Sequence, residues 1–130
     1  TIRVTVASGT LLPYVNVLDT GSGDVATSLP ASPMNSGILV GLANGAGANG
    51  PFGSDVYLAN GDPSNPANVT LAFFASGANP SPPRLATVGI PPGGNIVVTD
   101  VLTALFSTTG DGVVTVSSDA PVSAAQTVRA

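Results

Sequence analysis

Hydrophobic and polar residues alternate along much of the chain, which is typical of β-strands with one buried face. The pattern begins at once, because Ile2, Val4 and Val6 fall on one face of residues 1–8. Residues 11–18 are apolar on both faces, as in a fully buried strand. With a short turn between them, these two segments predict an N-terminal hairpin.

The strongest strand signal is the alternation of Val69, Leu71 and Phe73 on one face. Residues 44–51 are rich in Gly and Asn and predict a loop. The same alternation, bounded by turn-forming residues, predicts further strands at 37–43, 54–60, 84–90, 95–99, 113–118 and 122–129. We expect the last two of these to form a closing hairpin through residues 119–121.

One segment has helical periodicity instead. Leu102, Leu105 and Phe106 are spaced i, i+3 and i+4, which predicts a short helical turn near 100–106. About seven to nine short antiparallel strands with one helical turn predict an all-β fold, an immunoglobulin-like β-sandwich. We expect Phe73 and Phe106 to lie in its core.

A short pattern occurs twice in the chain. Val4–Ser8 and Val114–Ser118 agree at four of five positions, and each is followed by turn residues and a second apolar segment. Strands rich in Val and Thr also resemble one another by chance. If the duplication is real, residues 1–20 are a spare hairpin and residues 21–130 are the sandwich domain.

The amino-acid composition limits the kinds of catalytic, metal and binding site that the chain can form. The 130 residues carry seven acidic and three basic side chains, with a net charge of −4 and no His, Cys, Lys or Glu. Catalytic triads, zinc or copper sites and disulfides therefore lack their residues. Three Arg cannot form a patch that neutralises phosphates. We expect no enzyme activity, no cofactor or metal, and no nucleic-acid or membrane partner.

Two motifs near residue 20 can be interpreted either as a functional site or as an ordinary turn. Asp19-Thr20-Gly21, after an apolar segment, resembles the active-site turn of aspartic proteases, yet these residues also suit an ordinary turn. Asp19 and Asp24 offer oxygen ligands for Ca²⁺, although their spacing is not that of an EF-hand. A solvated turn is the alternative in both cases.

The order of several segments resembles the tandem β-sandwich repeats of large bacterial secreted and surface proteins. The segments that carry the resemblance are Ile2–Val6, Tyr14–Asp24, Leu29–Ala31, Ser54–Asn60, Val69–Phe73, Pro91–Gly94, Thr99–Phe106 and Val114–Val122. The chain departs from the pattern at Phe52 and Gly53, where such repeats often have Trp-Arg. The resemblance implies an extracellular or cell-surface module, structural or adhesive, without catalytic residues.

These observations predict a structural subunit that assembles with itself, head to tail, into an extracellular filament or surface array. Charged residues make up only 8% of the chain, so copies repel one another weakly. A spare hairpin needs partners for its backbone groups, and a neighbouring subunit supplies them by strand donation. The residues expected to be buried by that neighbour are Ile2, Val4, Val6, Leu11, Val15 and Val17. The alternative is a monomeric secreted adhesin, spacer or carbohydrate-binding module, with Tyr14 or Tyr57 against a glycan.

Overall fold

The computed structural model describes residues 4–10, 15–18, 20, 25–28, 32–48, 50–77 and 82–129. The chain divides into two compact units, Thr1–Ser32 and Pro33–Ala130. We call them the N-terminal unit and the body. The boundary between the two units thus follows residue 32, whereas the sequence predicts one after residue 20.

The N-terminal unit contains one two-stranded sheet. Strand β1 (Val15–Leu18) pairs antiparallel with β2 (Val25–Ser28), so that Val15 lies opposite Ser28. The described residues Val4–Thr10 form no strand. The predicted pairing of residues 1–8 with 11–18 is therefore wrong for this part of the chain. The partner of residues 15–18 lies on the other side of the turn-forming residues 19–24, where the sequence analysis expected no strand.

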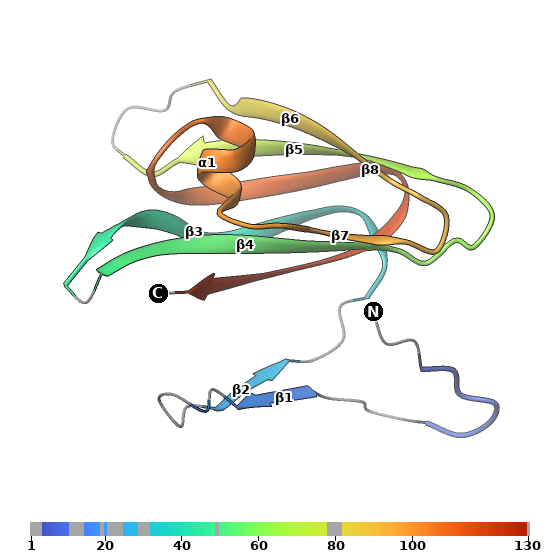
Figure 1. The fold of residues 1–130 in the computed structure, drawn as a ribbon. Coiled ribbons are helices and arrows are strands. Elements are labelled where there is room, and N and C mark those ends of the chain that lie inside the picture. The colour runs from blue at the N-terminus through green and yellow to red at the C-terminus, as the bar shows by residue number, and fades with distance from the viewer. Residues whose placement is uncertain are drawn as a thin grey trace. The chain divides into compact units, whose positions relative to one another are not determined.

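The body is a six-stranded antiparallel sheet in its described residues, with the order β6-β5-β8-β3-β4-β7 (Figure 1). Its elements are β3 (Met34–Gly47), β4 (Gly50–Asn60), β5 (Ala67–Ala75), β6 (Arg84–Ile90), β7 (Asn95–Val98), α1 (Val101–Phe106) and β8 (Gly110–Arg129). The all-β prediction is confirmed, and so is the short helix near 100–106. The sheet curls into a half-barrel rather than dividing into the two separate sheets of a clear sandwich.

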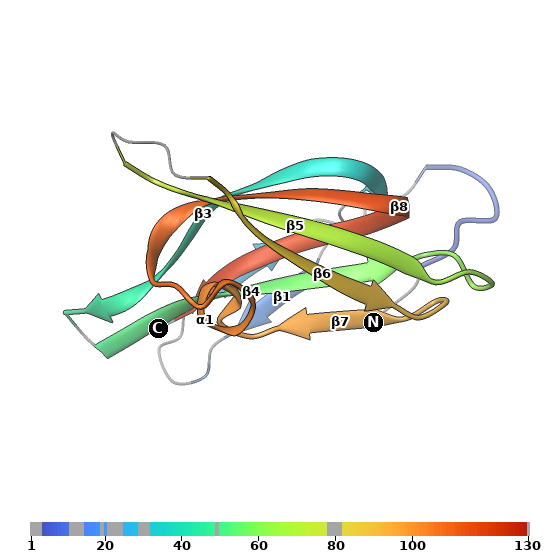
Figure 2. The same cartoon turned by 90° about the horizontal axis from the view of Figure 1, so that it is seen from above.

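Strand β8 explains the curl (Figure 2). Its first half, residues 112–118, pairs with β5, and its second half, residues 122–129, pairs with β4. The predicted closing hairpin is therefore wrong, because the two halves are one bent strand of 20 residues. Asp119 to Pro121 have no ladder partner, so Pro121, which lacks an N–H, costs the sheet no hydrogen bond at the bend.

The predicted Gly-rich loop at 44–51 is instead the end of the β3–β4 hairpin. Gly45 lies opposite Phe52, and Gly47 lies opposite Gly50. The Phe52 ring lies against both strand glycines, and a Cβ on Gly47 would come within 3.0 Å of the Gly50 carbonyl oxygen. Small residues here let the two strands and the ring pack closely, so this segment forms a hairpin despite the low strand propensity of Gly that predicted a loop.

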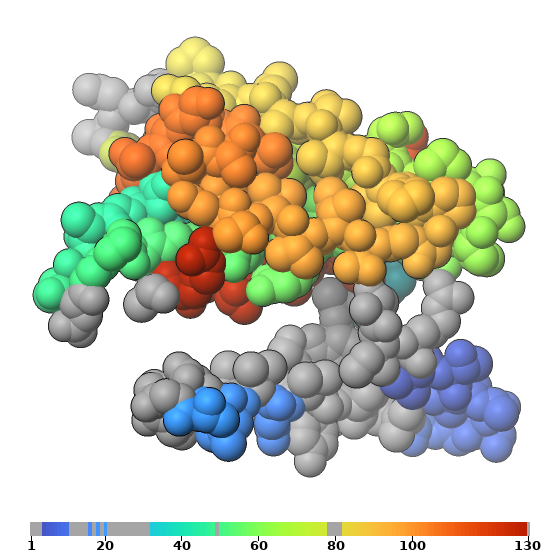
Figure 3. Space-filling model, in the orientation of Figure 1, coloured from blue at the N-terminus to red at the C-terminus, as the bar shows by residue number. Residues whose placement is uncertain are grey.

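The core lies inside the curled sheet. Val69, Leu71 and Phe73 alternate inward from β5, each at most 2% exposed. Helix α1 adds Leu102 and Phe106, and the Phe73 and Phe106 rings lie 5.6 Å apart between centroids, as the sequence analysis expected of two core residues. The residues of β6, β7 and α1 form a continuous surface over this side of the body (Figure 3). The helix therefore closes the open side of the half-barrel.

Truncating the core should destabilise the body strongly. Leu71 is fully buried, and we expect Leu71→Ala to lower the free energy of unfolding by about 2–5 kcal/mol. The matched control is Leu85→Ala, because Leu85 is 67% exposed and the same change there should cost about 0.5 kcal/mol or less. Urea unfolding followed by circular dichroism measures both. Equal losses in the two variants would contradict the assigned core.

Candidate functional site

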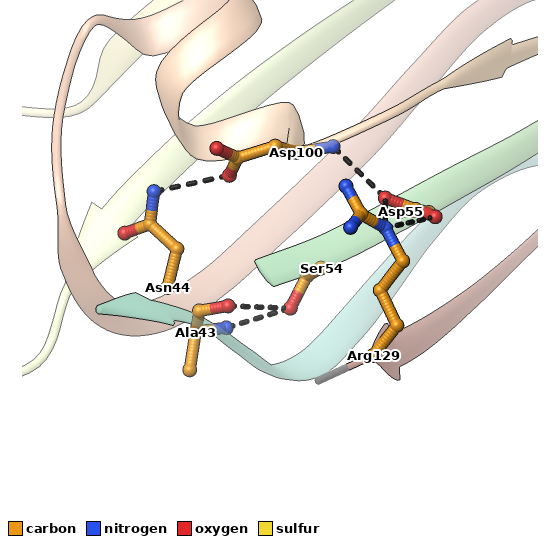
Figure 4. A network of polar contacts seen from close by, with 6 residues as sticks. All are labelled: Ala43, Asn44, Ser54, Asp55, Asp100 and Arg129. Atoms are coloured by element: carbon orange, nitrogen blue, oxygen red, sulfur yellow. Dashed lines mark hydrogen bonds and ion pairs between the residues drawn. The ribbon is translucent and has the colours of Figure 1, made fainter. Parts of the chain in front are cut away.

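One network of polar contacts surrounds the start of α1, and Asn44, which is 6% exposed, belongs to it (Figure 4). Its side-chain amide nitrogen donates to Asp100 Oδ1 at 3.0 Å and to Thr103 Oγ1 at 2.8 Å. Its amide oxygen accepts a hydrogen bond from the Gly110 N–H at 3.1 Å. One side chain thus joins β3, both ends of the first helical turn and the start of β8. A buried amide with partners on both ends holds these elements in register.

A second group of contacts fastens the end of β8. Asp55 on β4 is 7% exposed, and the Nε of Arg129 lies 2.8 Å from its Oδ2. The other oxygen of Asp55 also accepts a hydrogen bond from the Asp100 N–H at 2.9 Å. Asp100 has a left-handed backbone, with φ of 47°, and its carboxylate lies over Gly53. A Cβ at Gly53 would come within 3.3 Å of Asp100 Oδ1, so a small residue makes room for the helix start.

Ser54 joins β3 and β4 where their ladder has ended. Its hydroxyl donates to the Ala43 carbonyl oxygen at 2.9 Å and accepts from the Ala43 N–H at 2.8 Å. At the other end of the helix, Arg84 Nη1 donates to the Phe106 carbonyl oxygen at 2.9 Å. The positive charge of Arg84 at this position also interacts favourably with the negative end of the helix dipole. These polar groups are all partnered within the chain, so their role is to fix α1 on the sheet.

Beside this network lies a surface hollow of about 520 Å³. Hydroxyl side chains line it, from Thr103, Ser107, Thr108 and Thr109. The hollow offers hydrogen bonds and no charged group. In the part of the chain that the structure describes, no three His, Cys, Asp or Glu side chains come together as a metal site would require.

The predicted assembly residues lie in the N-terminal unit, and the structure describes some of them. Val4 is 54% exposed and Val6 is 45% exposed. Val15 and Val17 belong to β1, and their side chains lie outside the described part. The remaining two predicted residues, Ile2 and Leu11, also lie outside it. Burial of this set by a neighbouring subunit stays a prediction.

Other predicted candidates also fall outside the described residues. They are Asp19 and Gly21 of the Asp19-Thr20-Gly21 turn, together with Asp24 and Tyr14. Tyr57 is described, and it is 40% exposed on β4.

An apolar patch that the sequence did not predict lies on the outer face of the sheet. One row crosses four strands through Leu85, Ala72, Thr115 and Ile38. Leu85 is 67% exposed and Ile38 is 64% exposed. The next row holds Phe74 opposite Val113, and Val40 lies two residues beyond Ile38 on the same face; together these residues form what we call the outer patch. Ile38 and Val40 lie in the apolar run of residues 37–40, which gives no sign of which side chains face solvent.

A row of hydroxyl side chains borders the outer patch. Thr87, Thr70, Ser117 and Ser36 lie opposite one another across β6, β5, β8 and β3. Neither this row nor the outer patch holds a charged residue. These two rows therefore add no charge repulsion between copies of the chain.

Two exposed carboxylates hold turns together. The Asn68 N–H and its side-chain amide both donate to Asp119 at 2.8 Å, and these bonds hold the pKa of Asp119 below its ordinary value of 3.8. Hydrogen bonds from the Asn65 side chain and from the backbone N–H groups of Ser64 and Asn65 lower the pKa of Asp62 in the same way. The Asp119 pair ties the start of β5 to the bend of β8.

Comparison with known proteins gives a likeness of fold. No family model matches the chain, and no curated protein matches it. Among solved structures, the fold of the chain is similar to that of the Anabaena sensory rhodopsin transducer, with a TM-score of 0.54 and 17% sequence identity. The match covers 72% of this chain and 85% of that protein. At this identity the likeness concerns the β fold alone.

In the described part of the chain, no helix has the length and apolar character needed to span a membrane.

Removing the Asn44 amide should loosen α1. We expect Asn44→Ala to lower the free energy of unfolding by about 1–3 kcal/mol, because the Gly110 N–H loses its buried acceptor. The control is Asn95→Ala, since Asn95 is exposed on β7. Thermal unfolding of both variants at neutral pH makes the comparison. A loss no larger than that of the control would mean that Asn44 does not hold the helix.

The Asp119 bonds should give a pH-dependent contribution to stability. A lowered pKa in the folded state means that this contribution is present above pH 3.8 and is lost as the pH falls through the lowered value. Asp119→Asn should therefore be less stable than the unsubstituted chain at pH 7, and the gap should close on acidification. Urea unfolding from pH 7 to pH 2 measures this, with Asp111→Asn as the control. A gap that stays constant with pH would contradict the assignment.

Proposed function

We propose that this chain is a structural subunit that assembles with itself through its N-terminal unit, in an extracellular or cell-surface filament or array. The observation that carries the proposal is the N-terminal unit itself. It is a compact unit with only a two-stranded sheet in its described residues, and its described apolar side chains, Val4, Val6 and Leu18, are exposed. A two-stranded sheet alone is marginally stable in water. It gains stability when another surface covers it.

The body has a core of its own. Every buried hydrophobic residue that the structure describes lies between Leu39 and Ala124. The N-terminal unit is therefore not needed to fill that core, and it is available to a neighbouring copy. Contact between the N-terminal unit of one copy and the body of the next is head to tail, and such a contact continues from copy to copy unless it closes into a ring.

Charge opposes association between copies only weakly. The chain has a net charge of −4 from ten charged side chains, and the outer patch and its hydroxyl row hold none of them. Exposed apolar side chains gathered on one face are typical of an interaction surface. Low mutual repulsion and an apolar face together support a permanent assembly over a free monomer.

The extracellular location and the relationship to immunoglobulin-like sandwich repeats belong to the same proposal. The order of sequence segments that resembles bacterial surface repeats supports both. The two halves of β8 pair with different strands, β5 and β4, and this division supports the relationship to sandwich repeats. The proposal includes no catalysis, no cofactor and no nucleic-acid or membrane partner, because the sequence has no His, Cys, Lys or Glu and only three Arg.

Deletion of residues 1–32 should leave folded monomers. The full chain should form filaments or sheets of uniform width in negative-stain electron microscopy, and the deleted chain should scatter light as single molecules. Its circular dichroism should stay that of a β protein, because the core residues all remain.

A finer comparison uses substitutions in the full chain. Val6→Asp should prevent assembly because it places a charge in the apolar contact, whereas Thr5→Asp on the opposite face should impair it less. A full-length chain that stays at 12.6 kDa at all concentrations would overturn the proposal. It would favour the monomeric adhesin, spacer or carbohydrate-binding module, which a glycan array then tests.

A further inference from the structure

We propose that the surface which receives the N-terminal unit is the free edge of β6 on the neighbouring copy, and that Val4–Ser8 adds to this edge as a further strand. This inference rests on the proposed function and specifies its contact. A strand at the edge of a sheet has unpaired N–H and C=O groups, which bind another strand through backbone hydrogen bonds.

β6 is an edge strand without the usual protection. Among the described residues it pairs with β5 alone, over seven residues from Arg84 to Ile90. Natural edges are protected by charged side chains, Pro or a bulge. β6 has a regular register and only one charge, Arg84, whose guanidinium is bonded to the Phe106 carbonyl oxygen. Helix α1 contacts β6, and among the described residues no strand pairs with the side of β6 that faces away from β5.

The other edges of the body are less accessible. β7 is only four residues long and leads directly into α1. On the second half of β8, the Gln126 side-chain amide donates to the Val40 carbonyl oxygen of β3. The Ser54 hydroxyl binds the N–H and the carbonyl oxygen of Ala43, which also belongs to β3. The Gln126 bond joins β3 to the second half of β8, and the Ser54 bonds join β3 to β4, so side chains of the body already occupy part of these edges. On β6 the corresponding contact is that of Arg84, at one end of the strand.

The donor segment has a sequence that already pairs within this sheet. Val4–Ser8 repeats four of five residues of Val114–Ser118, and that part of β8 pairs with both β5 and β3. In β8, Val114 and Val116 are buried while Thr115 lies on the outer face. In the N-terminal unit the equivalent segment forms no strand and its valines are exposed.

The two sides are also complementary in shape and polarity. Ala86 and Val88 alternate toward the core from β6 and are only partly buried, because no strand lies beyond them. Val4 and Val6 of an added strand fall on the same side and would cover them. Thr5 would then lie on the outer face, next to Leu85, Thr87 or Gly89 according to register.

Cysteine pairing between copies tests this placement, because the chain has no Cys of its own. One preparation carries Thr5→Cys and a tag. The second carries a single Cys on the outer side of β6, at Leu85, Thr87 or Gly89; a Cβ fits at Gly89, where the nearest atom is 3.9 Å away. Mixed assemblies are oxidised, and tagged heterodimers are quantified on non-reducing gels.

Two control positions distinguish the edge from other surfaces. Thr70→Cys lies on the same outer face directly opposite Thr87, one strand further into the sheet, and Val97→Cys lies on the other edge. A disulfide needs Cα atoms within about 7 Å, and strands two apart are separated by roughly 10 Å. We expect at least one β6 position to form heterodimer about tenfold faster than either control.

Every other outcome overturns the assignment. Preferred pairing with Thr70→Cys would place the N-terminal unit on the outer face, and preferred pairing with Val97→Cys would place it on β7. Assemblies that form without any of these crosslinks would reject strand addition at β6 and leave the proposed function intact. A full-length chain that never assembles would reject the proposed function itself.

Discussion

The body depends on the backbone ladders of β8. This strand pairs with β5, β3 and β4, so three of the other five strands of the body are joined through it. Its bend at Asp119–Pro121 turns one sheet back over its own inner face, and this enclosure creates the core. The residues at the bend pair with no strand, and Asp119 instead accepts hydrogen bonds from Asn68. The bend is therefore fixed by side-chain contacts where the ladder is interrupted.

Helix α1 completes the enclosure, and polar contacts hold it in place. Three side chains attach the helix to different strands. Asp55 on β4 binds its start, Asn44 on β3 binds its first turn, and Arg84 on β6 binds its last carbonyl group. These contacts explain why a chain with so few charges keeps several of them in internal bonds. The charges that remain are then too few to cover the outer face, which leaves its apolar patch and hydroxyl row uncharged.

Local patterns predicted the elements well and their partners poorly. The alternation of Val69, Leu71 and Phe73 fixed which face of β5 is buried, and the helical spacing before Phe106 located α1. The continuation of β8 through Pro121 could not be read from the sequence, because a proline between two strands looks like a turn unless the ladder partners are known. The network around Asn44 was also missed, since its members come from distant segments and no spacing joins them. The repeated Val4–Ser8 pattern was visible, but the sequence did not show that its counterpart is a central strand and not half of a hairpin.

The position of β8 along the chain has a consequence for how the protein is made. The strand that joins the sheet follows all the other strands of the body in the sequence. During synthesis β3, β4 and β5 emerge well before the residues that pair with them. The sheet therefore cannot close until this segment has left the ribosome, and its long-range pairings make closure slow compared with that of a helical protein of the same size. Until then β3, β4 and β5 lack the ladders that β8 forms with them, and the apolar residues that these ladders enclose stay exposed.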